Sequence, residues 1–307
     1  MNFQPATMAT DGYLSACCMA NSPPSPSRDY AVYRQVINRV LTDTERLPSL
    51  PSITLKIRQA MGETNTTADS LSRIITKDPA LSALLLKSAS SPVYRRAIAP
   101  NSLVDVISLL GFATVSNLVM LHSMRSVFTM SSRQAKTLFA QTWRRLMVKL
   151  ALSVFIAKRL RFTPVEHPQM VALLSEVGSL AVLSALIEQP QIPDENTYFQ
   201  LCRSYSKSLG GILLHKWNID AVFIKTVKNI GNWEINDGET LTLMDIMNLS
   251  IYYTVMMTNS HPKLPELTTL PAFYKLPKHM RVCTKNNWLD WIYDNKKEIQ
   301  EIVASFM

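Results

Sequence analysis

The chain has 307 residues, 47% of them hydrophobic, and carries a formal net charge of +9. This size and composition are typical of a globular protein with a substantial core, and only 8 glycines disfavour a fold made of many tight strand turns. The four cysteines lack the spacing of a zinc site or a disulfide framework, and the absence of a secretion signal and of any uninterrupted apolar run of membrane-spanning length predicts a cytoplasmic protein.

The N-terminal part is predicted to pass from an irregular tail into short helices. Residues 1–29 are rich in serine and proline and show no periodicity, which predicts a disordered tail. Over residues 30–41 the apolar residues recur with helical spacing. The motif Leu47-Pro-Ser-Leu-Pro-Ser52 predicts an extended lead-in to a helix. Thr66 and Asp69, three residues apart, predict the capping box of the next helix.

Further capping signals follow in the same half of the chain. Asp78 and Pro79 predict a helix start, with the carboxylate as cap and the proline at the first helical position. Ser102 and Asp105 predict a second capping box. Gly111 then indicates a break between helices or a close approach of two backbones.

The second half is predicted to hold longer helices and no strand. The Gly210-Gly211 doublet lies inside a helical pattern, which favours close contact between two helices over a phosphate loop. The segment over 169–187 is apolar on nearly every side and is therefore expected to be central. Helices are predicted over 139–160, 169–187, 204–217, 220–230, 242–257 and, after an irregular stretch, 287–306. Together these elements predict an all-α protein that forms an irregular multi-helix bundle.

Several motifs in one order resemble the HDOD domain, which is found in bacterial signalling and regulatory proteins. They are Leu47-Pro-Ser-Leu-Pro-Ser52, Ile74-Ile-Thr-Lys-Asp-Pro-Ala-Leu81, Val104-Asp-Val-Ile-Ser-Leu-Leu-Gly111, Leu209-Gly210 and Lys216-Trp217-Asn218. The similarity covers about residues 45–257. The resemblance implies the fold of the HD superfamily, with a helical domain over 30–262 and a C-terminal extension over 263–307 that ends in an amphipathic helix.

The resemblance also implies where metal ligands would lie. Enzymes of the HD superfamily bind one or two divalent ions through histidines, a His-Asp pair inside a helix and a later aspartate, and these ions activate water against a phosphate ester. The corresponding positions are Arg145, Ser175-Glu176 and a position near Ile251, with intermediate histidines expected near Ser206 and Ile230-Gly231. Only Glu176 could bind a hard cation, and an arginine would repel one.

Accordingly, the resemblance implies a degenerate site with no catalytic residue, no bound metal and no cofactor. The function it implies is a non-catalytic signal-transduction module that binds a protein partner. A residual metal-dependent phosphohydrolase built on Glu176 is the less favoured alternative.

The charge distribution suggests a candidate recognition surface. Residues 106–165 contain no Asp or Glu but nine Lys and Arg residues, which equal the whole net charge. On a helix, three of these cations would fall within about 50° of one another. The predicted face comprises Arg144, Arg145, Lys149, Lys158 and Arg159. Three interpretations stay open at this point: an ordinary solvated face, a docking surface for an acidic protein, or a binding surface for nucleic acid or a nucleotide signal.

Overall fold

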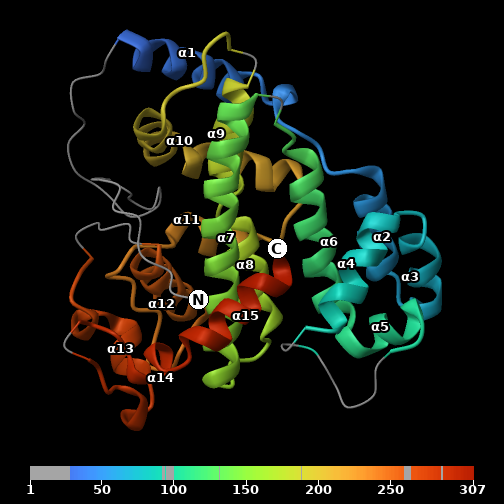
Figure 1. Cartoon of the computed structure of the whole chain (residues 1–307), viewed down its shortest axis with the longest axis vertical. Helices are drawn as coiled ribbons and strands as arrows, with labels where there is room; N and C mark the ends of the chain where they lie inside the picture. Colours follow the sequence, from blue (N-terminus) through green and yellow to red (C-terminus); the bar gives the residue numbers. More distant parts are fainter. Residues whose placement is uncertain are drawn as a thin grey trace, which may run out of the picture.

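The structure is a computed structural model that describes residues 28–307 except 92–93, 95–99, 131, 188, 259–263 and 285 (Figure 1). The tail predicted over residues 1–29 lies outside the described residues up to residue 27, and residues 28 and 29 already belong to the first helix. Within the described part, β pairing is limited to one isolated bridge between Cys283 and Leu289. The prediction of an all-α fold is confirmed.

The α-helices follow one another from the N-terminus as separate elements. They are α1 (Arg28–Thr42), α2 (Ser52–Gly62), α3 (Ala68–Ile75), α4 (Pro79–Ala89), α5 (Leu103–Leu110), α6 (Phe112–Val127), α7 (Arg133–Arg159), α8 (Glu166–Leu174), α9 (Val177–Leu186), α10 (Glu195–Lys216), α11 (Ala221–Asn229), α12 (Leu243–Met257), α13 (Pro271–Lys275), α14 (Asp290–Tyr293) and α15 (Lys296–Phe306). Short 3₁₀ turns lie at Thr44–Arg46 (η1), Leu267–Thr269 (η2) and Lys278–Met280 (η3).

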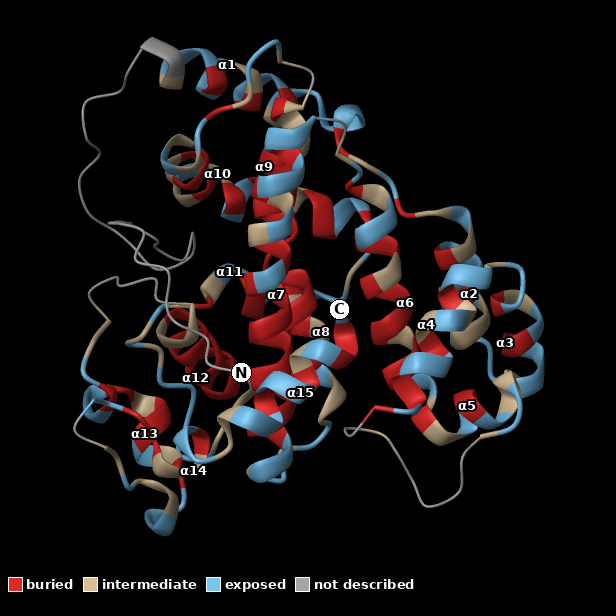
Figure 2. Cartoon of the chain, viewed as in Figure 1, coloured by how far each residue is buried: buried red, intermediate tan, exposed pale blue. Residues whose placement is uncertain are grey.

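Helix α7 is the axis around which the other helices are arranged (Figure 1). It packs against α8, α9, α12 and α15. Helices α2 to α5 cluster on one flank, α1 and α10 lie at one end, and α12 to α14 lie near the other. Figure 2 shows burial concentrated along α7, α8 and α12, which places the core in the middle of the bundle.

Two predicted helix starts are confirmed by their caps. Asp78 accepts a hydrogen bond from the Leu81 amide at the start of α4, and Ser102 and Asp105 form the predicted capping box of α5. Gly111 has a φ of 77° between α5 and α6, a conformation that disfavours residues with a Cβ. The chain turns by 107° there.

Several helix predictions were wrong in detail. The helix predicted over 139–160 begins at Arg133, where Ser132 caps it, and the one predicted over 287–306 is divided into α14 and α15. The capping box of α3 is formed by Thr67 and Ser70, because the Thr66 hydroxyl instead donates to the Ala60 carbonyl. The helix predicted to begin at residue 204 begins at Glu195, where the preceding Asp194 accepts from the Thr197 amide. Thr66 and Thr67 are neighbouring residues that are both suitable caps, whereas the cap of α10 lies well before its predicted start.

The segment predicted as one helix over 169–187 consists of two helices. The chain leaves α8 at Ser175, and Glu176, with φ −103° and ψ 0°, precedes α9. Taken together, residues Glu166–Leu186 are long and apolar enough to cross a membrane, but 83% of the apolar window is buried inside the protein. Packing against other helices therefore accounts for this composition, as the prediction of a central segment requires.

Two of the recognised motifs are joined to each other by hydrogen bonds. The Lys216 amino group donates to the carbonyl oxygens of Thr44, Glu45 and Leu47 at 3.0, 3.4 and 2.8 Å. The Trp217 indole donates to the Pro48 carbonyl at 2.9 Å. Within the turn after α1, the Leu47 amide donates to the Thr44 carbonyl, and the C-terminal end of α10 supplies further donors to the carbonyl groups of this turn.

We expect the Lys216→Met substitution to lower the free energy of unfolding by about 1–2 kcal/mol, because it leaves these carbonyl groups without a charged donor. Urea denaturation followed by circular dichroism measures the change. The control is Lys207→Met, which removes an exposed lysine from the same helix. Equal stability of the two variants would show that the hydrogen bonds from Lys216 to the turn after α1 do not stabilise the fold.

The C-terminal segment packs on the main bundle and does not stand apart from it. The Leu289 amide donates to the Tyr253 hydroxyl at 3.0 Å, and Lys275 and Asp245 form an ion pair at 2.9 Å with both side chains almost fully buried. Apolar residues of α15 belong to the same core cluster as those of α7. The extension predicted over 263–307 thus shares the core of the preceding helices over its described residues.

Candidate functional site

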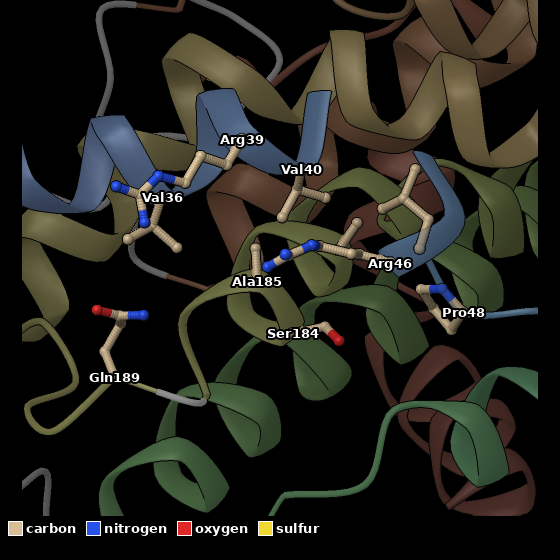
Figure 3. A pocket seen from close by; sticks show the side chains of 10 residues that line it. Val36, Arg39, Val40, Arg46, Pro48, Ser184, Ala185 and Gln189 are labelled. Carbon is tan, nitrogen blue, oxygen red and sulfur yellow. The ribbon is translucent and has the colours of Figure 1, made fainter. Parts of the chain in front are cut away.

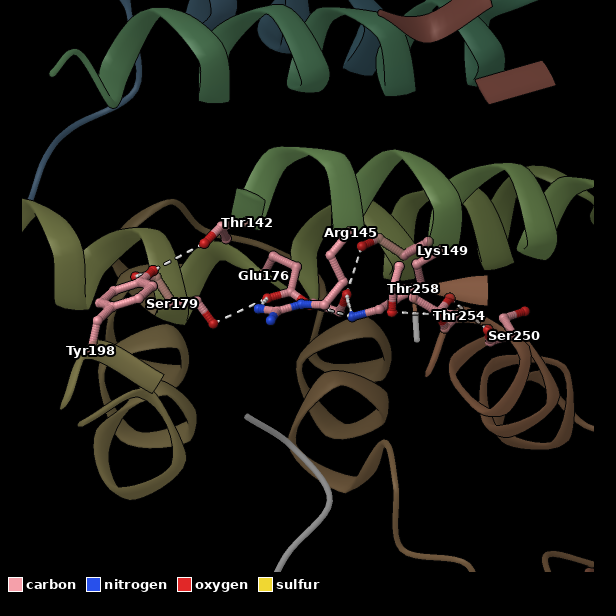
Figure 4. Close-up of polar contacts among 11 residues, drawn as sticks. Thr142, Arg145, Lys149, Glu176, Ser179, Tyr198, Ser250, Thr254 and Thr258 are labelled. Atoms are coloured by element: carbon pink, nitrogen blue, oxygen red, sulfur yellow. Dashed lines mark hydrogen bonds and ion pairs between the residues drawn. The ribbon is translucent and has the colours of Figure 1, made fainter. Parts of the chain in front are cut away.

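The structure brings Arg145 of α7 together with Glu176, which lies between α8 and α9 (Figure 4). Ser175, the preceding residue, contacts Lys149 of α7. Arg145 makes a bidentate contact with Glu176: Nε lies 3.1 Å from Oε1 and Nη2 lies 2.7 Å from Oε2. The Lys149 amino group lies 2.6 Å from Glu176 Oε1 and 2.9 Å from Ser175 Oγ. We call Arg145, Lys149 and Glu176 the ion cluster.

Local geometry explains how these side chains meet. Arg145 and Lys149 are four residues apart, so they share one face of α7 and both reach the same point on the neighbouring segment (Figure 4). The Ser175 hydroxyl donates to the Ala172 carbonyl at 2.7 Å at the end of α8, and the Ser175 amide also donates to it at 3.3 Å. Ser179, one turn into α9, donates to Glu176 Oε2 at 3.0 Å.

The ion cluster is buried. The exposed fraction is 8% for Arg145, 1% for Lys149 and 2% for Glu176. Burial by itself raises the pKa of the Glu176 carboxyl, but the charges and hydrogen bonds of Arg145 and Lys149 outweigh burial and hold that pKa well below its ordinary value of 4.5. Glu176 is therefore ionised in the folded protein, and the cluster carries two positive charges against one negative charge.

Helix α10 closes the cluster on another side. The Tyr198 hydroxyl donates to the Ser179 carbonyl at 2.9 Å and lies 3.2 Å from the Thr142 hydroxyl, and the Arg145 guanidinium lies over the Phe199 ring. Burial raises the pKa of the neighbouring Cys202 thiol to about 12, which makes it unreactive at neutral pH. The surroundings of the cluster are thus packed protein.

The residues at the positions implied for metal ligands do not fit a divalent cation. Both carboxylate oxygens of Glu176 already accept bonds from cationic side chains. Ile251 is buried on α12, which packs against α7 and α8. Among the residues that the structure describes, no group of three or more His, Cys, Asp or Glu side chains could hold a metal ion.

The predicted recognition face was wrong, because its central members are not at the surface. Arg145 and Lys149 point into the protein toward Glu176 (Figure 4). Arg159 donates to Asn295 Oδ1 at 2.9 Å and lies 3.4 Å from a Glu298 oxygen, so it joins α7 to α15. Lys158 lies over the Tyr94 ring at 5.3 Å. Arg144, Lys158 and Arg159 are exposed on α7, but the burial of Arg145 and Lys149 leaves no continuous face between Arg144 and the other two.

The sequence analysis placed Arg145, Ser175 and Glu176 at the positions that the resemblance implies for metal ligands, but it did not predict the ion cluster. It also missed the hydrogen bonds of Ser179 and Tyr198 beside the cluster. The sequence does contain a signal for the ion cluster. Glu176 is the only acidic residue in the apolar segment from Val171 to Ile187. A carboxylate in such a setting needs a cationic partner, and Arg145 with Lys149 offers two on one helix face.

Comparison with known proteins identifies the fold. The family model of the HDOD domain matches residues 47–232 of the chain, which is more than half of it. No curated protein sequence matches significantly.

Solved structures share the architecture at low sequence identity. A protein of Shewanella amazonensis SB2B, provisionally described as a metal-dependent phosphohydrolase, has a TM-score of 0.72 and 17% identity, with coverage of 90% of this chain and 100% of that one. An HDOD domain protein of unknown function from Geobacter sulfurreducens has a TM-score of 0.61 and 16% identity, with coverage of 90% and 97%. A protein of Marinobacter aquaeolei VT8, provisionally described as a signal transduction protein, has a TM-score of 0.57 and 14% identity, with coverage of 91% and 66%.

Proposed function

The chain belongs to the HDOD family, and we propose that it is a non-catalytic regulatory module of bacterial signal transduction that acts in the cytoplasm by binding a protein partner. The observation that carries the proposal is the buried ion cluster. The ion cluster includes Arg145 and Glu176, two of the positions that the resemblance implies for metal ligands, and joins them to each other and to Lys149 inside the protein.

The chemistry of the ion cluster supports a structural role. Metal-dependent hydrolysis needs an ion with an open coordination position that lowers the pKa of bound water. Here the one carboxylate is saturated by charged donors, and the cations would repel a divalent ion. Arg145 and Lys149 supply positive charge beside the carboxylate of Glu176, at 2.7 and 2.6 Å.

The HDOD fold and the signalling description of the Marinobacter aquaeolei relative support the regulatory part of the proposal. The nucleic-acid alternative depended on a basic face over Arg144 to Arg159, and the burial of Arg145 and Lys149 removes its centre. Binding to nucleic acid is therefore an outcome to be tested against protein binding.

We expect the purified chain to contain no stoichiometric manganese, zinc or iron and to hydrolyse bis(p-nitrophenyl) phosphate with Mn²⁺ no faster than heat-inactivated protein. Elemental analysis and absorbance measure the two quantities. Stoichiometric metal together with hydrolysis that EDTA removes would contradict the non-catalytic proposal.

The proposal that the chain binds a protein partner is tested by recovery of that partner from lysate. We expect the tagged chain to retain a protein from native lysate after nuclease treatment, and we expect the two purified proteins to form a complex of defined stoichiometry. If recovery collapses with nuclease, the chain instead binds nucleic acid or a ribonucleoprotein, and the protein-binding proposal is overturned.

A further inference from the structure

A pocket of about 430 Å³ lies between α1, the turn that follows it and α9, away from the ion cluster (Figure 3). Its size is that of sites that hold small molecules, which span about 300–1,000 Å³. The lining residues are Val36, Arg39, Val40, Arg46, Leu47, Pro48, Ala181, Ser184, Ala185 and Gln189.

The lining combines apolar walls with two cations. Val36, Val40 and Ala185 present aliphatic surface, while the side chains of Arg39 and Arg46 extend along the pocket (Figure 3). Among the described lining residues there is no Asp or Glu. Both cations in the lining are arginines, and Asp43, which is not a lining residue, offsets part of the charge of Arg46.

Arg46 forms an ion pair with Asp43 at the surface, where the two side chains are 60% and 51% exposed. Its Nε donates to Asp43 Oδ2 at 2.9 Å, and this contact is made through one edge of the guanidinium group. Arginine carries five N–H donors, so the terminal nitrogens retain donors for a second acceptor. A carboxylate or phosphate group matches the paired donors of a guanidinium group.

The turn that carries Arg46 is held by other parts of the fold. Lys216 donates to three carbonyl groups of residues 44–47, and Trp217 donates to the carbonyl of Pro48. Leu47 is buried beneath the turn. One wall of the pocket is thus set before any ligand arrives, which lowers the entropy cost of binding.

Both arginines come from residues that precede the family match. The HDOD match covers 47–232, whereas Arg39 lies on α1 and Arg46 on η1. Helix α1 packs against α9 and α10, so one wall of the pocket is formed by α1 and the opposite wall by helix α9 of the HDOD domain. The cationic character of the site is therefore a property of this N-terminal segment.

We propose that this pocket binds a small organic anion. Its carboxylate or phosphate group pairs with Arg39 and Arg46, and its apolar body lies against Val36, Val40 and Ala185. The site is independent of the proposed protein partner, so either proposal can fail without the other. A phosphate ester and a carboxylic acid share this chemistry, and their relative affinities identify which head group the arginines prefer.

The test uses the full chain and three probes that share a benzene ring: phenyl phosphate, benzoate and the neutral benzyl alcohol. Isothermal titration calorimetry at low salt measures each affinity. We expect at least one of the anions to bind, and to bind at least about tenfold more tightly than benzyl alcohol, because only the anions gain charge-assisted hydrogen bonds.

Three variants locate the site, and circular dichroism confirms that each is folded. Arg39→Gln and Arg46→Gln are each expected to weaken anion binding about tenfold, and Ala185→Leu is expected to abolish binding by filling the pocket. The matched control is Arg34→Gln, which removes an exposed arginine from the same helix outside the pocket and is expected to bind as the unaltered chain does. Failure of both anions to bind at millimolar concentration, or equal affinity in all folded variants, would overturn the proposal.

Discussion

Replacing Glu176 with glutamine is expected to lower the free energy of unfolding by about 3–5 kcal/mol, the cost typical of removing one partner of a buried ion pair. Arg145 and Lys149 would then lie buried with no counter-charge, at exposed fractions of 8% and 1%. Urea denaturation at pH 7, followed by tryptophan fluorescence, measures the change. A variant that is unfolded without denaturant agrees with the upper end of this range.

Two further variants separate the effect of buried charge from the loss of any carboxylate. Glu298→Gln removes a half-exposed partner of Arg159 and is expected to cost less than about 1 kcal/mol. The double variant Glu176→Gln with Lys149→Met is expected to regain part of the stability, because it removes one of the two unneutralised cations. If Glu176→Gln costs no more than Glu298→Gln, the ion cluster does not stabilise the fold.

The Glu176 carboxyl also determines how the stability of the fold is expected to depend on pH. The pKa of Glu176 is lower in the folded protein than its ordinary value of 4.5, so the folded state favours the ionised carboxylate. Its contribution is complete at neutral pH, and it is lost as the pH falls from about 4.5 toward the lower pKa of the folded state. We expect the urea midpoint of the unaltered chain to fall over this acidic range more steeply than that of the double variant.

The Gly178→Ala substitution is expected to lower the free energy of unfolding by about 3 kcal/mol, at the upper end of the usual cost of overpacking. A Cβ at Gly178 would lie 1.9 Å from the carbonyl oxygen of Ser206 and 2.6 Å from its carbonyl carbon. Both atoms belong to the backbone of α10, so α9 and α10 would have to move apart. Calorimetric or urea unfolding measures the loss.

Two other glycines provide a graded control. A Cβ at Gly210 would lie 3.2 Å from backbone atoms of Gly178, so Gly210→Ala is expected to cost about 1 kcal/mol. A Cβ at Gly62 would meet no atom within 4 Å, and Gly62→Ala at the end of α2 is expected to be neutral or stabilising by less than about 1 kcal/mol. An equal change in the free energy of unfolding for all three substitutions would show that the close contact of α9 and α10 does not limit which side chains fit at Gly178.

The sequence alone predicted the helical class and many helix starts, because these depend on residues close together in the chain. Apolar periodicity and the caps at Asp78 and Ser102 act within a few residues, and the structure places those caps as predicted. The Gly210-Gly211 doublet likewise indicated a close helix contact, which Gly178 and Gly210 make. The order of short motifs was also sufficient to indicate the HDOD family, which the match to residues 47–232 confirms.

Only the tertiary structure decided what the charged side chains do. Arg145 and Lys149 look like the surface of a basic helix, because their counter-charge, Glu176, lies 31 and 27 residues further along the chain. The same distance hid the division of 166–186 into α8 and α9, since the break occurs where Glu176 meets those cations. The energy of a buried charge depends on which groups surround it in space, and local sequence patterns do not contain that information.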